Sequence, residues 1–171
     1  MYFTTLLLLL GISAVPIKPA DAFCYEEAGN RYGISPPLLY AISKGESSFN
    51  PIAINYNTNG SYDYGLMQIN SSWEPTLRKL GIPWGALADP CTNVMVGAWV
   101  LSQCIRDYGY TWPAVGCYNS RTPSKRDRYA AKIARIIKQK QPHQRIEQIA
   151  AITDTSKVTP WEEAFGIVAS R

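Results

Sequence analysis

The sequence predicts a mainly helical domain that carries one small β or loop lobe. Apolar residues recur at helical spacing in several segments that begin at capping residues and end at Gly or Pro. Residues 53–70 are instead crowded with Asn, Gly and Tyr, a composition typical of turns and short hairpins. A chain of 171 residues is long enough to bury one core, and it contains no internal repeat.

Two helices are expected before the polar stretch. The first covers residues 23–32, and Gly33 is suited to end it because glycine readily adopts the left-handed conformation of a helix C-cap. The second covers residues 35–50. Ser35 can cap its free N–H groups, and Pro36 suits the first helical position.

Residues 53–64 are expected to form a small hairpin or irregular loop with Asn59-Gly60 at its tip. In the stretch that follows, residues 65–70, Leu66 and Ile69 are suited to anchor the chain. This leaves three side chains available to a cleft beside the second helix, namely Met67, Gln68 and Asn70.

Four further helices are expected after this lobe. Their expected caps are Ser71 or Ser72, Asp89, Thr111 and Ser124. Pro142 is expected to interrupt the pattern after the last of them, and residues 145–152 form a separate candidate helix.

Residues 1–22 are predicted to be a signal peptide. The apolar run from Leu6 through Val15 is too short to span a bilayer comfortably, and Ala20-Asp21-Ala22 has the small-x-small pattern of a signal-peptidase site. Cleavage is expected after Ala22. No Lys or Arg precedes the apolar run, so an uncleaved N-terminal anchor is the alternative.

Four cysteines follow this segment, and export would place them in an oxidising compartment where they pair. Cys91 and Cys104 fall on one expected helix, thirteen residues apart, which is roughly 20 Å and too far for a bridge. We therefore expect Cys24–Cys91 together with Cys104–Cys117, whose members flank a short turn. One bridge with two buried thiols is the alternative.

Glu46 is the candidate chemical group of the second helix. It follows Ile42 by four residues, so it projects from the apolar stripe that Leu38, Leu39 and Ile42 form toward the core. Loss of water disfavours the charged carboxylate and raises its pKa, which makes Glu46 a candidate proton donor near neutral pH. The alternative is a structural glutamate that is half solvated or paired with Lys44 or an arginine.

Several classes of function are excluded by what the sequence lacks. The single histidine, His143, lies far from any Ser or Cys in a supporting context, which argues against a nucleophilic hydrolase. No glycine-rich phosphate loop and no cysteine pair with zinc spacing occur, so no cofactor and no metal are expected. The net charge of +4 is mild, and no basic block predicts nucleic-acid binding.

Four segments together resemble the soluble lytic transglycosylase (goose-lysozyme-like) family. They are Glu46-Ser47, Gly65-Leu66-Met67-Gln68-Ile69-Asn70, Asp89-Pro90 with Asn93, and Tyr118-Asn119. The resemblance implies a lysozyme-like α+β fold, a catalytic domain over residues 23–140 and a C-terminal tail over residues 141–171. The chain is most similar to small exported members that accompany type III or type IV secretion, conjugation or pilus machines.

The resemblance also implies roles for individual residues. Glu46 matches the acid that protonates the bond between N-acetylmuramic acid and N-acetylglucosamine, after which the substrate's own acetamido group assists and a 1,6-anhydro ring closes. Cleft positions are matched by Ser47, Met67, Gln68, Asn70, Tyr118 and Tyr129, and Tyr129 has a core residue as its alternative interpretation. The family pattern Ala-Tyr-Asn-Ala-Gly becomes Cys117-Tyr118-Asn119-Ser120-Arg121, and Arg121 is expected to contact peptide carboxylates.

The implied function is a monomeric, periplasmic peptidoglycan lytic transglycosylase that opens the cell wall locally for an envelope-spanning apparatus. A muramidase that uses water, and a non-catalytic wall-binding module, are the alternatives. The tail over residues 141–171 is expected to fold back on the domain as a helix, to be a frayed tail, or to dock on a partner.

Overall fold

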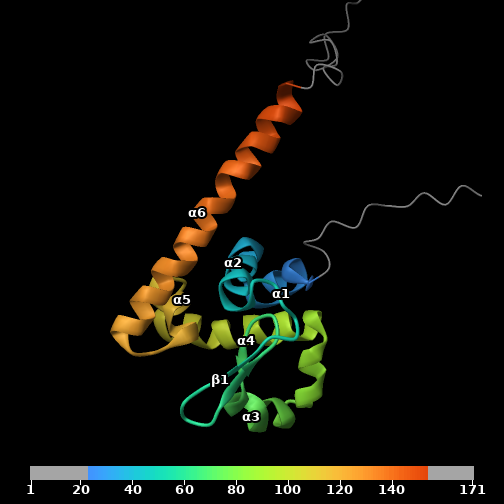
Figure 1. Ribbon diagram of the computed structural model, residues 1–171, viewed down its shortest axis with the longest axis vertical. Coiled ribbons are helices and arrows are strands. Elements are labelled where there is room, and N and C mark those ends of the chain that lie inside the picture. Colours follow the sequence, from blue (N-terminus) through green and yellow to red (C-terminus); the bar gives the residue numbers. More distant parts are fainter. Residues whose placement is uncertain (1–22, 154–171) are drawn as a thin grey trace, which may run out of the picture.

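The computed structural model describes residues 23–153, so the predicted signal peptide and residues 154–171 lie outside it. The expected class, mainly helical with a small β lobe, is confirmed (Figure 1). The elements in order are α1 (Tyr25–Tyr32), α2 (Pro36–Ser47), β1 (Ile54–Tyr56), β2 (Tyr62–Tyr64), β3 (Ile69–Asn70), η2 (Ser71–Trp73), α3 (Glu74–Lys79), η3 (Trp84–Ala88), α4 (Pro90–Tyr108), α5 (Trp112–Asn119) and α6 (Pro123–Thr153).

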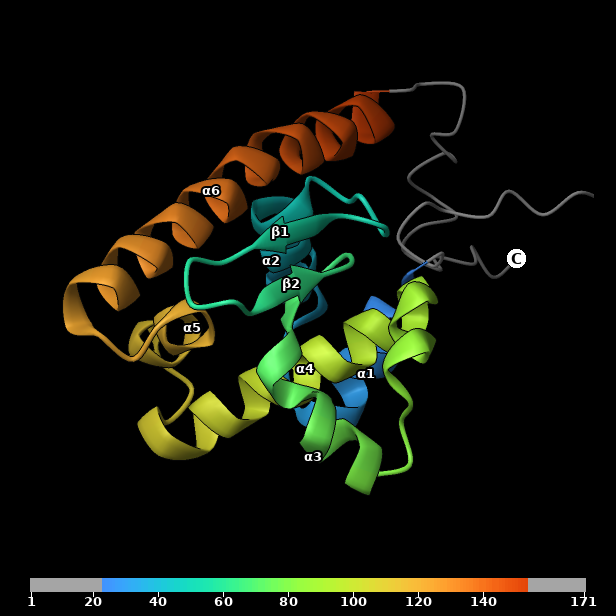
Figure 2. The ribbon, with the colours of Figure 1, turned by 60° about the horizontal axis from the view of Figure 1, so that its bottom comes forward.

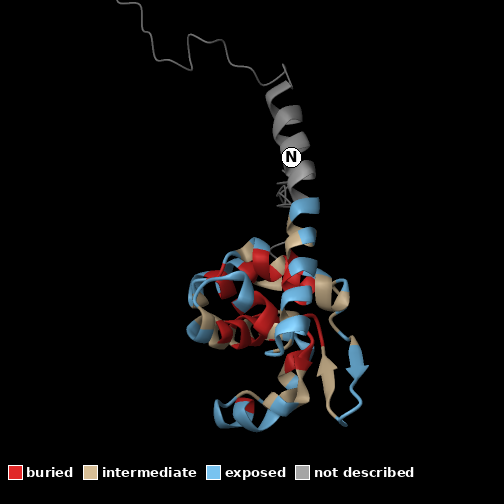
Figure 3. Ribbon diagram, turned by 90° about the vertical axis from the view of Figure 1, so that its left-hand side faces the viewer, coloured by how far each residue is buried: buried red, intermediate tan, exposed pale blue. Residues whose placement is uncertain are grey.

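The three strands form one antiparallel sheet in the order β1-β2-β3. The expected hairpin tip at Asn59-Gly60 is confirmed. The Gly60 N–H donates to the Asn57 carbonyl at 3.1 Å, and the φ of Gly60 is 82°, a left-handed value that glycine adopts without steric cost. Figure 3 shows that β1 is the exposed edge of this sheet.

Neighbouring strand residues point to opposite faces of the sheet. Asn55 and Asp63, which are paired across β1 and β2, carry the polar face. On the other face the ring of Tyr62 packs edge-to-face against Trp84 at 5.8 Å between centroids. The hairpin therefore presents amides and a carboxylate on the face that β2 shares with Asn70 of β3.

Some expected helix boundaries are confirmed. Gly33 ends α1 with a φ of 65°. Asp89 caps α4, since its Oδ2 accepts from the Thr92 N–H at 2.7 Å and from the Thr92 hydroxyl at 2.8 Å. Ser35 occupies the N-cap position of α2, but its side chain makes no capping hydrogen bond, and its own N–H donates to the Tyr110 hydroxyl at 2.9 Å.

Other caps differ from the expectation. The side chain that caps the segment after β3 belongs to Asn70, whose Oδ1 accepts from the Ser72 N–H at 3.0 Å. Thr111 stands at the N-cap of α5 without a side-chain cap bond. α6 begins at Pro123, which places Ser124 inside the helix. Proline suits this first position because its missing N–H has no helical partner there.

The expected interruption at Pro142 is wrong. α6 continues without a break to Thr153, and residues 145–152 are part of the same helix, which extends away from the domain (Figure 1). The general rule that proline disfavours a helix interior therefore does not hold at residue 142.

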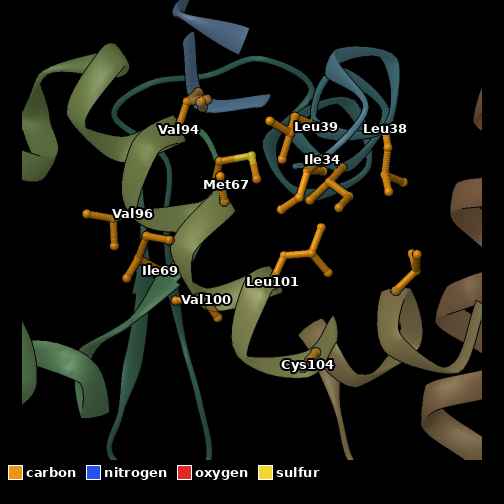
Figure 4. Packing of buried hydrophobic residues seen from close by; sticks show 14 of the residues in the cluster. Ile34, Leu38, Leu39, Met67, Ile69, Val94, Val96, Val100, Leu101 and Cys104 are labelled. Carbon is orange, nitrogen blue, oxygen red and sulfur yellow. The ribbon is translucent and has the colours of Figure 1, made fainter. Parts of the chain in front are cut away.

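The core lies where α2, α4, α5 and the first turns of α6 meet the turn before β3. Figure 4 shows Met67 among side chains of α2 and α4. Full burial of such a side chain stabilises the folded state by about 1.5–3 kcal/mol. The largest fully buried hydrophobic side chains are Leu39, Ile42, Leu66, Met67, Ile69, Leu77, Leu87, Leu101, Ile133 and Val94.

α6 packs along both α2 and α5 (Figure 2). Two glycines permit this close approach. A Cβ on Gly116 of α5 would lie 2.2 Å from the Arg126 carbonyl oxygen, and a Cβ on Gly45 of α2 would lie 2.8 Å from Cδ1 of Ile133. Both glycines therefore set how closely α6 packs against its neighbours.

The expected disulfide pairing is confirmed. Cys24–Cys91 links the start of α1 to the start of α4, and Cys104–Cys117 links α4 to α5, with Cα–Cα distances of 5.2 and 5.8 Å. Within residues 23–153, no helix combines the length and the apolar character that crossing a membrane requires.

Candidate active site

Glu46 lies in the last turn of α2, and its side chain is half-buried. Burial raises its pKa above the ordinary value. The Tyr129 hydroxyl, which donates a hydrogen bond to Oε1 of Glu46, and the charge of Lys132 act in the opposite direction, and Asp63 adds to the rise. The net effect is a carboxyl group that keeps its proton to higher pH than an exposed glutamate does.

α6 supplies two groups around this acid. Tyr129 is buried, and its hydroxyl donates to Oε1 of Glu46. Lys132 lies one turn further along α6. Its Nζ donates to the Gly45 carbonyl at 2.5 Å and lies 5.8 Å from the centroid of the Tyr129 ring. Lys132 thus contacts both the residue before Glu46 and the tyrosine that binds it.

A buried asparagine on α4 positions the turn that faces Glu46. Asn93 is fully buried, and its Oδ1 accepts from the Met67 N–H at 2.8 Å. Its Nδ2 donates to the carbonyls of Leu87 at 3.1 Å and Tyr64 at 3.2 Å. Gly65 makes room for this amide, since a Cβ there would lie 2.1 Å from Nδ2.

Gln68 and Asn70 line the same side of the site, and hydrogen bonds fix both amides. Gln68 has a φ of 51°, which is unfavourable for a residue with a side chain. Its Nε2 donates to the Gly65 carbonyl at 2.7 Å, and its Oε1 accepts from Asn55 at 2.6 Å. Nδ2 of Asn70 donates to Asp63 at 2.7 Å. These contacts hold the two side chains in one orientation.

Tyr118 forms the opposite wall, on α5. Its hydroxyl donates to the Met67 carbonyl at 2.7 Å, and its ring stacks on Tyr129 with 6.4 Å between centroids. Burial raises the pKa of both tyrosines well above the ordinary value, and the nearby Glu46 carboxylate adds to that rise. Both therefore stay neutral and keep a proton to donate.

Three of the predicted cleft residues do not line the groove. Tyr129 is one of them, since it is buried in the core, as its alternative interpretation predicts. Met67 and Ser47 are the other two. The Met67 side chain is fully buried, and its sulfur accepts from the Ser43 hydroxyl at 2.8 Å. The Ser47 hydroxyl donates to the Leu66 carbonyl at 2.8 Å and so connects α2 to the turn. Neither side chain lines the groove. The expectation that Met67 is available to a cleft is therefore wrong, and packing against Gly97 of α4 is the reason.

A groove of about 530 Å³ runs from the hairpin across Glu46 to α5 and the start of α6. Four of the predicted residues line it together, namely Glu46, Gln68, Asn70 and Tyr118, and Tyr129 lies behind Glu46. The complete lining is Glu46, Asn57, Thr58, Asn59, Ser61, Asp63, Gln68, Ile69, Asn70, Trp73, Val100, Tyr118, Asn119 and Lys125.

Sequence reasoning missed several of these residues. Asn57 and Asp63 could have been found from the sequence. Polar residues occupy every second position along this hairpin, and the face that they share borders the groove. Trp73 and Lys125 gave no such signal, because their contribution depends on how η2 and α6 are oriented against the domain. Arg121, which was expected to contact peptide carboxylates, does not line the groove and donates to Asp107 at 2.6 Å.

Comparisons with known proteins indicate the family of this chain. Residues 23–140 match the family model described as the transglycosylase SLT domain. Invasion protein IagB of Salmonella typhimurium is 45% identical over 130 residues, which cover 73% of this chain and 81% of that protein. Protein IpgF of Shigella flexneri is 43% identical over 117 residues, covering 68% of this chain and 77% of that protein.

Among solved structures, an inactive mutant of the lytic transglycosylase Slt from Pseudomonas aeruginosa superposes with a TM-score of 0.52 at 23% identity. The match covers 69% of this chain and 24% of that one, and it supports the lysozyme-like fold. A cell-wall enzyme family and two disulfides together indicate an exported protein. The chain belongs to the transglycosylase SLT domain family, and the expected enzyme class, a peptidoglycan lytic transglycosylase, is confirmed.

Proposed function

We propose that this protein cleaves the β-1,4 bond between N-acetylmuramic acid and N-acetylglucosamine and leaves a 1,6-anhydro ring on the muramic acid. The observation that carries the proposal is Glu46, a half-buried carboxyl group with a raised pKa that borders a polar groove. A protonated acid at this place is suited to protonate a leaving-group oxygen.

The reaction begins with proton transfer from Glu46 to the glycosidic oxygen, which breaks its bond to the anomeric carbon. The acetamido oxygen of the same sugar stabilises the positive charge on that carbon. The Glu46 carboxylate then takes the proton of the C6 hydroxyl, whose oxygen bonds to the anomeric carbon. Tyr129 donates to Oε1 of Glu46, so Oε2 is the oxygen that exchanges the proton with substrate.

A single catalytic carboxylate is consistent with the surroundings of Asp63. Glycosidases that use two carboxylates need the second as a nucleophile or as a base for water. Both oxygens of Asp63 already accept amide hydrogens, Oδ2 from Asn57 at 3.0 Å and Oδ1 from Asn70 at 2.7 Å. Asp63 accordingly orders the hairpin side of the groove in this proposal, and the acetamido group supplies the internal nucleophile.

The other predicted residues have distinct parts in the proposal. Gln68 and Asn70 form a fixed amide wall beside the sugar chain, and the Tyr118 ring closes the opposite wall near the reacting sugar. Tyr129 orients Glu46 from behind. Ser47 and Met67 act indirectly by fixing the turn over residues 65–68, Ser47 through Leu66 and Met67 through Asn93 and Tyr118.

The biological setting is also part of this proposal. We propose a periplasmic monomer, exported by a cleaved signal peptide, that opens peptidoglycan locally for a secretion, conjugation or pilus apparatus. One relative, at 45% identity, is named an invasion protein, which supports a link to such a machine. The tail over residues 141–171 is the proposed segment for docking on that machine.

Substitution of Glu46 by Gln tests the assignment of the acid. E46Q is expected to reduce the release of soluble fragments from peptidoglycan sacculi by at least about 10³-fold, since the same group serves as acid and then as base. Because burial disfavours the Glu46 charge, E46Q is expected to unfold at a temperature no lower than the wild type at neutral pH.

The carboxylate that lines the same groove provides the comparison. D63N is expected to keep activity within about tenfold of the wild type. Equal loss in D63N and E46Q would contradict the single-carboxylate route and support a two-carboxylate muramidase. Full activity in E46Q would refute the acid assignment. Binding of sacculi without cleavage by the wild type would support a non-catalytic wall-binding module.

A further inference from the structure

The groove has one cation among its described lining residues. Lys125 lies in the first turn of α6 and is exposed, and it lines the groove at the same end as Tyr118 and Asn119. It makes no hydrogen bond or ion pair within the part of the chain that the structure describes. Its charge is therefore free to meet a ligand.

Three neighbouring cations are already engaged. Arg121 pairs with Asp107 at 2.6 Å, Arg126 pairs with Asp127 at 2.8 Å, and Lys132 donates to the Gly45 carbonyl at 2.5 Å. The carboxylates that line the groove are Glu46 and Asp63. The groove therefore has an acidic part at α2 and the hairpin and a basic part at the start of α6.

The glycan strand alone does not need a cation. Its sugars are neutral, because the lactyl carboxyl group of N-acetylmuramic acid is joined by an amide bond to the stem peptide. The stem peptide itself carries free carboxylates. The stem peptide branches from the glycan strand, so its carboxylates lie away from the sugars. The unpaired ammonium group of Lys125, at the edge of the groove, is placed to meet such a carboxylate.

We propose that Lys125 binds a stem-peptide carboxylate and makes the enzyme prefer glycan strands whose stems are charged. This inference rests on the proposed function, because it concerns the substrate of the same groove. It replaces the sequence-based expectation for Arg121, whose guanidinium group is paired elsewhere.

Lys125 does not contribute to the shift in the Glu46 pKa. The charged groups that act on the Glu46 pKa are Lys132 and Asp63, and Lys125 is not among them. Loss of Lys125 is thus expected to weaken substrate binding without moving the pH dependence of cleavage. If Lys125 instead acted on Glu46, its loss would change the pH profile of cleavage. If it supported the fold, its loss would lower the activity on every substrate.

Two sacculus preparations test the proposal. One is native, and in the other the stem carboxylates have been converted to carboxamides with carbodiimide and excess ammonia. The full-length enzyme is assayed at low substrate concentration, where the rate reports kcat/KM. The wild type is expected to cleave native sacculi about 2- to 5-fold faster than amidated ones, the range of an exposed ion pair. High salt is expected to reduce this ratio.

Variants at the same position complete the test. K125Q is expected to lose the preference by slowing on native sacculi alone, while K125R keeps it. K138Q, which removes an exposed lysine of α6 outside the groove lining, is expected to behave as the wild type. Equal rates of the wild type on both preparations, or an equal loss by K125Q on both, would overturn the proposal. Failure of the wild type to cleave either preparation would instead refute the proposed function.

Discussion

Replacement of Asn93 by Ala is expected to destabilise the domain strongly. The change leaves the Met67 N–H and the Leu87 carbonyl, both in fully buried residues, without their partner, and it weakens the pairing of the Tyr64 carbonyl. A buried polar group left unpaired costs about 1–3 kcal/mol. Two such groups and a small cavity give an expected loss of about 3–5 kcal/mol in the free energy of unfolding.

Urea unfolding with the disulfides intact measures this loss, as a lower midpoint at an unchanged slope. In thermal unfolding it corresponds to a fall in Tm of roughly 10–20 °C for a domain of this size. The activity on sacculi is expected to fall as well, because Asn93 fixes the turn that carries Gln68 beside Glu46.

A second substitution on α4 serves as the control. Gln103 bonds only to groups within one turn of its own helix, among the described contacts, so Q103A is expected to cost less than about 1 kcal/mol. A loss below about 1 kcal/mol in N93A, comparable to that of Q103A, would refute the reasoning that the buried amide holds the turn in place.

Two more predictions concern the acid and the disulfide between α4 and α5. Lys132→Met removes a positive charge that lowers the Glu46 pKa, so the alkaline limb of the kcat/KM profile is expected to move to higher pH, whereas Lys138→Met leaves it in place. A limb that moves to lower pH would contradict the charge effect. Replacement of both Cys104 and Cys117 by Ser opens a loop with a sequence separation of 13. The free energy of unfolding, measured with urea, is expected to fall by about 3 kcal/mol. An unchanged midpoint would show that the bridge adds no stability.

Much of the framework could be predicted because its signals are local. The Asp89 cap, the Asn59-Gly60 hairpin tip and the disulfide pairing follow from short-range chemistry and from the length of one helix. The position of Glu46 follows from helical periodicity alone, since it lies one turn after the buried Ile42.

The remaining features depend on tertiary packing. Met67 points into the core because Gly97 of α4 leaves room for it, which is not visible in the sequence around residue 67. Lys125 reaches the groove because α6 begins at Pro123 and packs closely against Gly116. The helix also continues past Pro142, where the local rule predicts a break.

The mass of the sugar products tests the central claim most directly. Wild-type enzyme digests purified sacculi, and mass spectrometry of the fragments identifies the muramic acid ends. Ring closure onto the C6 hydroxyl predicts anhydro ends in the wild-type digest and no new ends of either kind with E46Q. Fragments that are heavier by one water, with ordinary reducing ends, would contradict the account and identify the enzyme as a hydrolase.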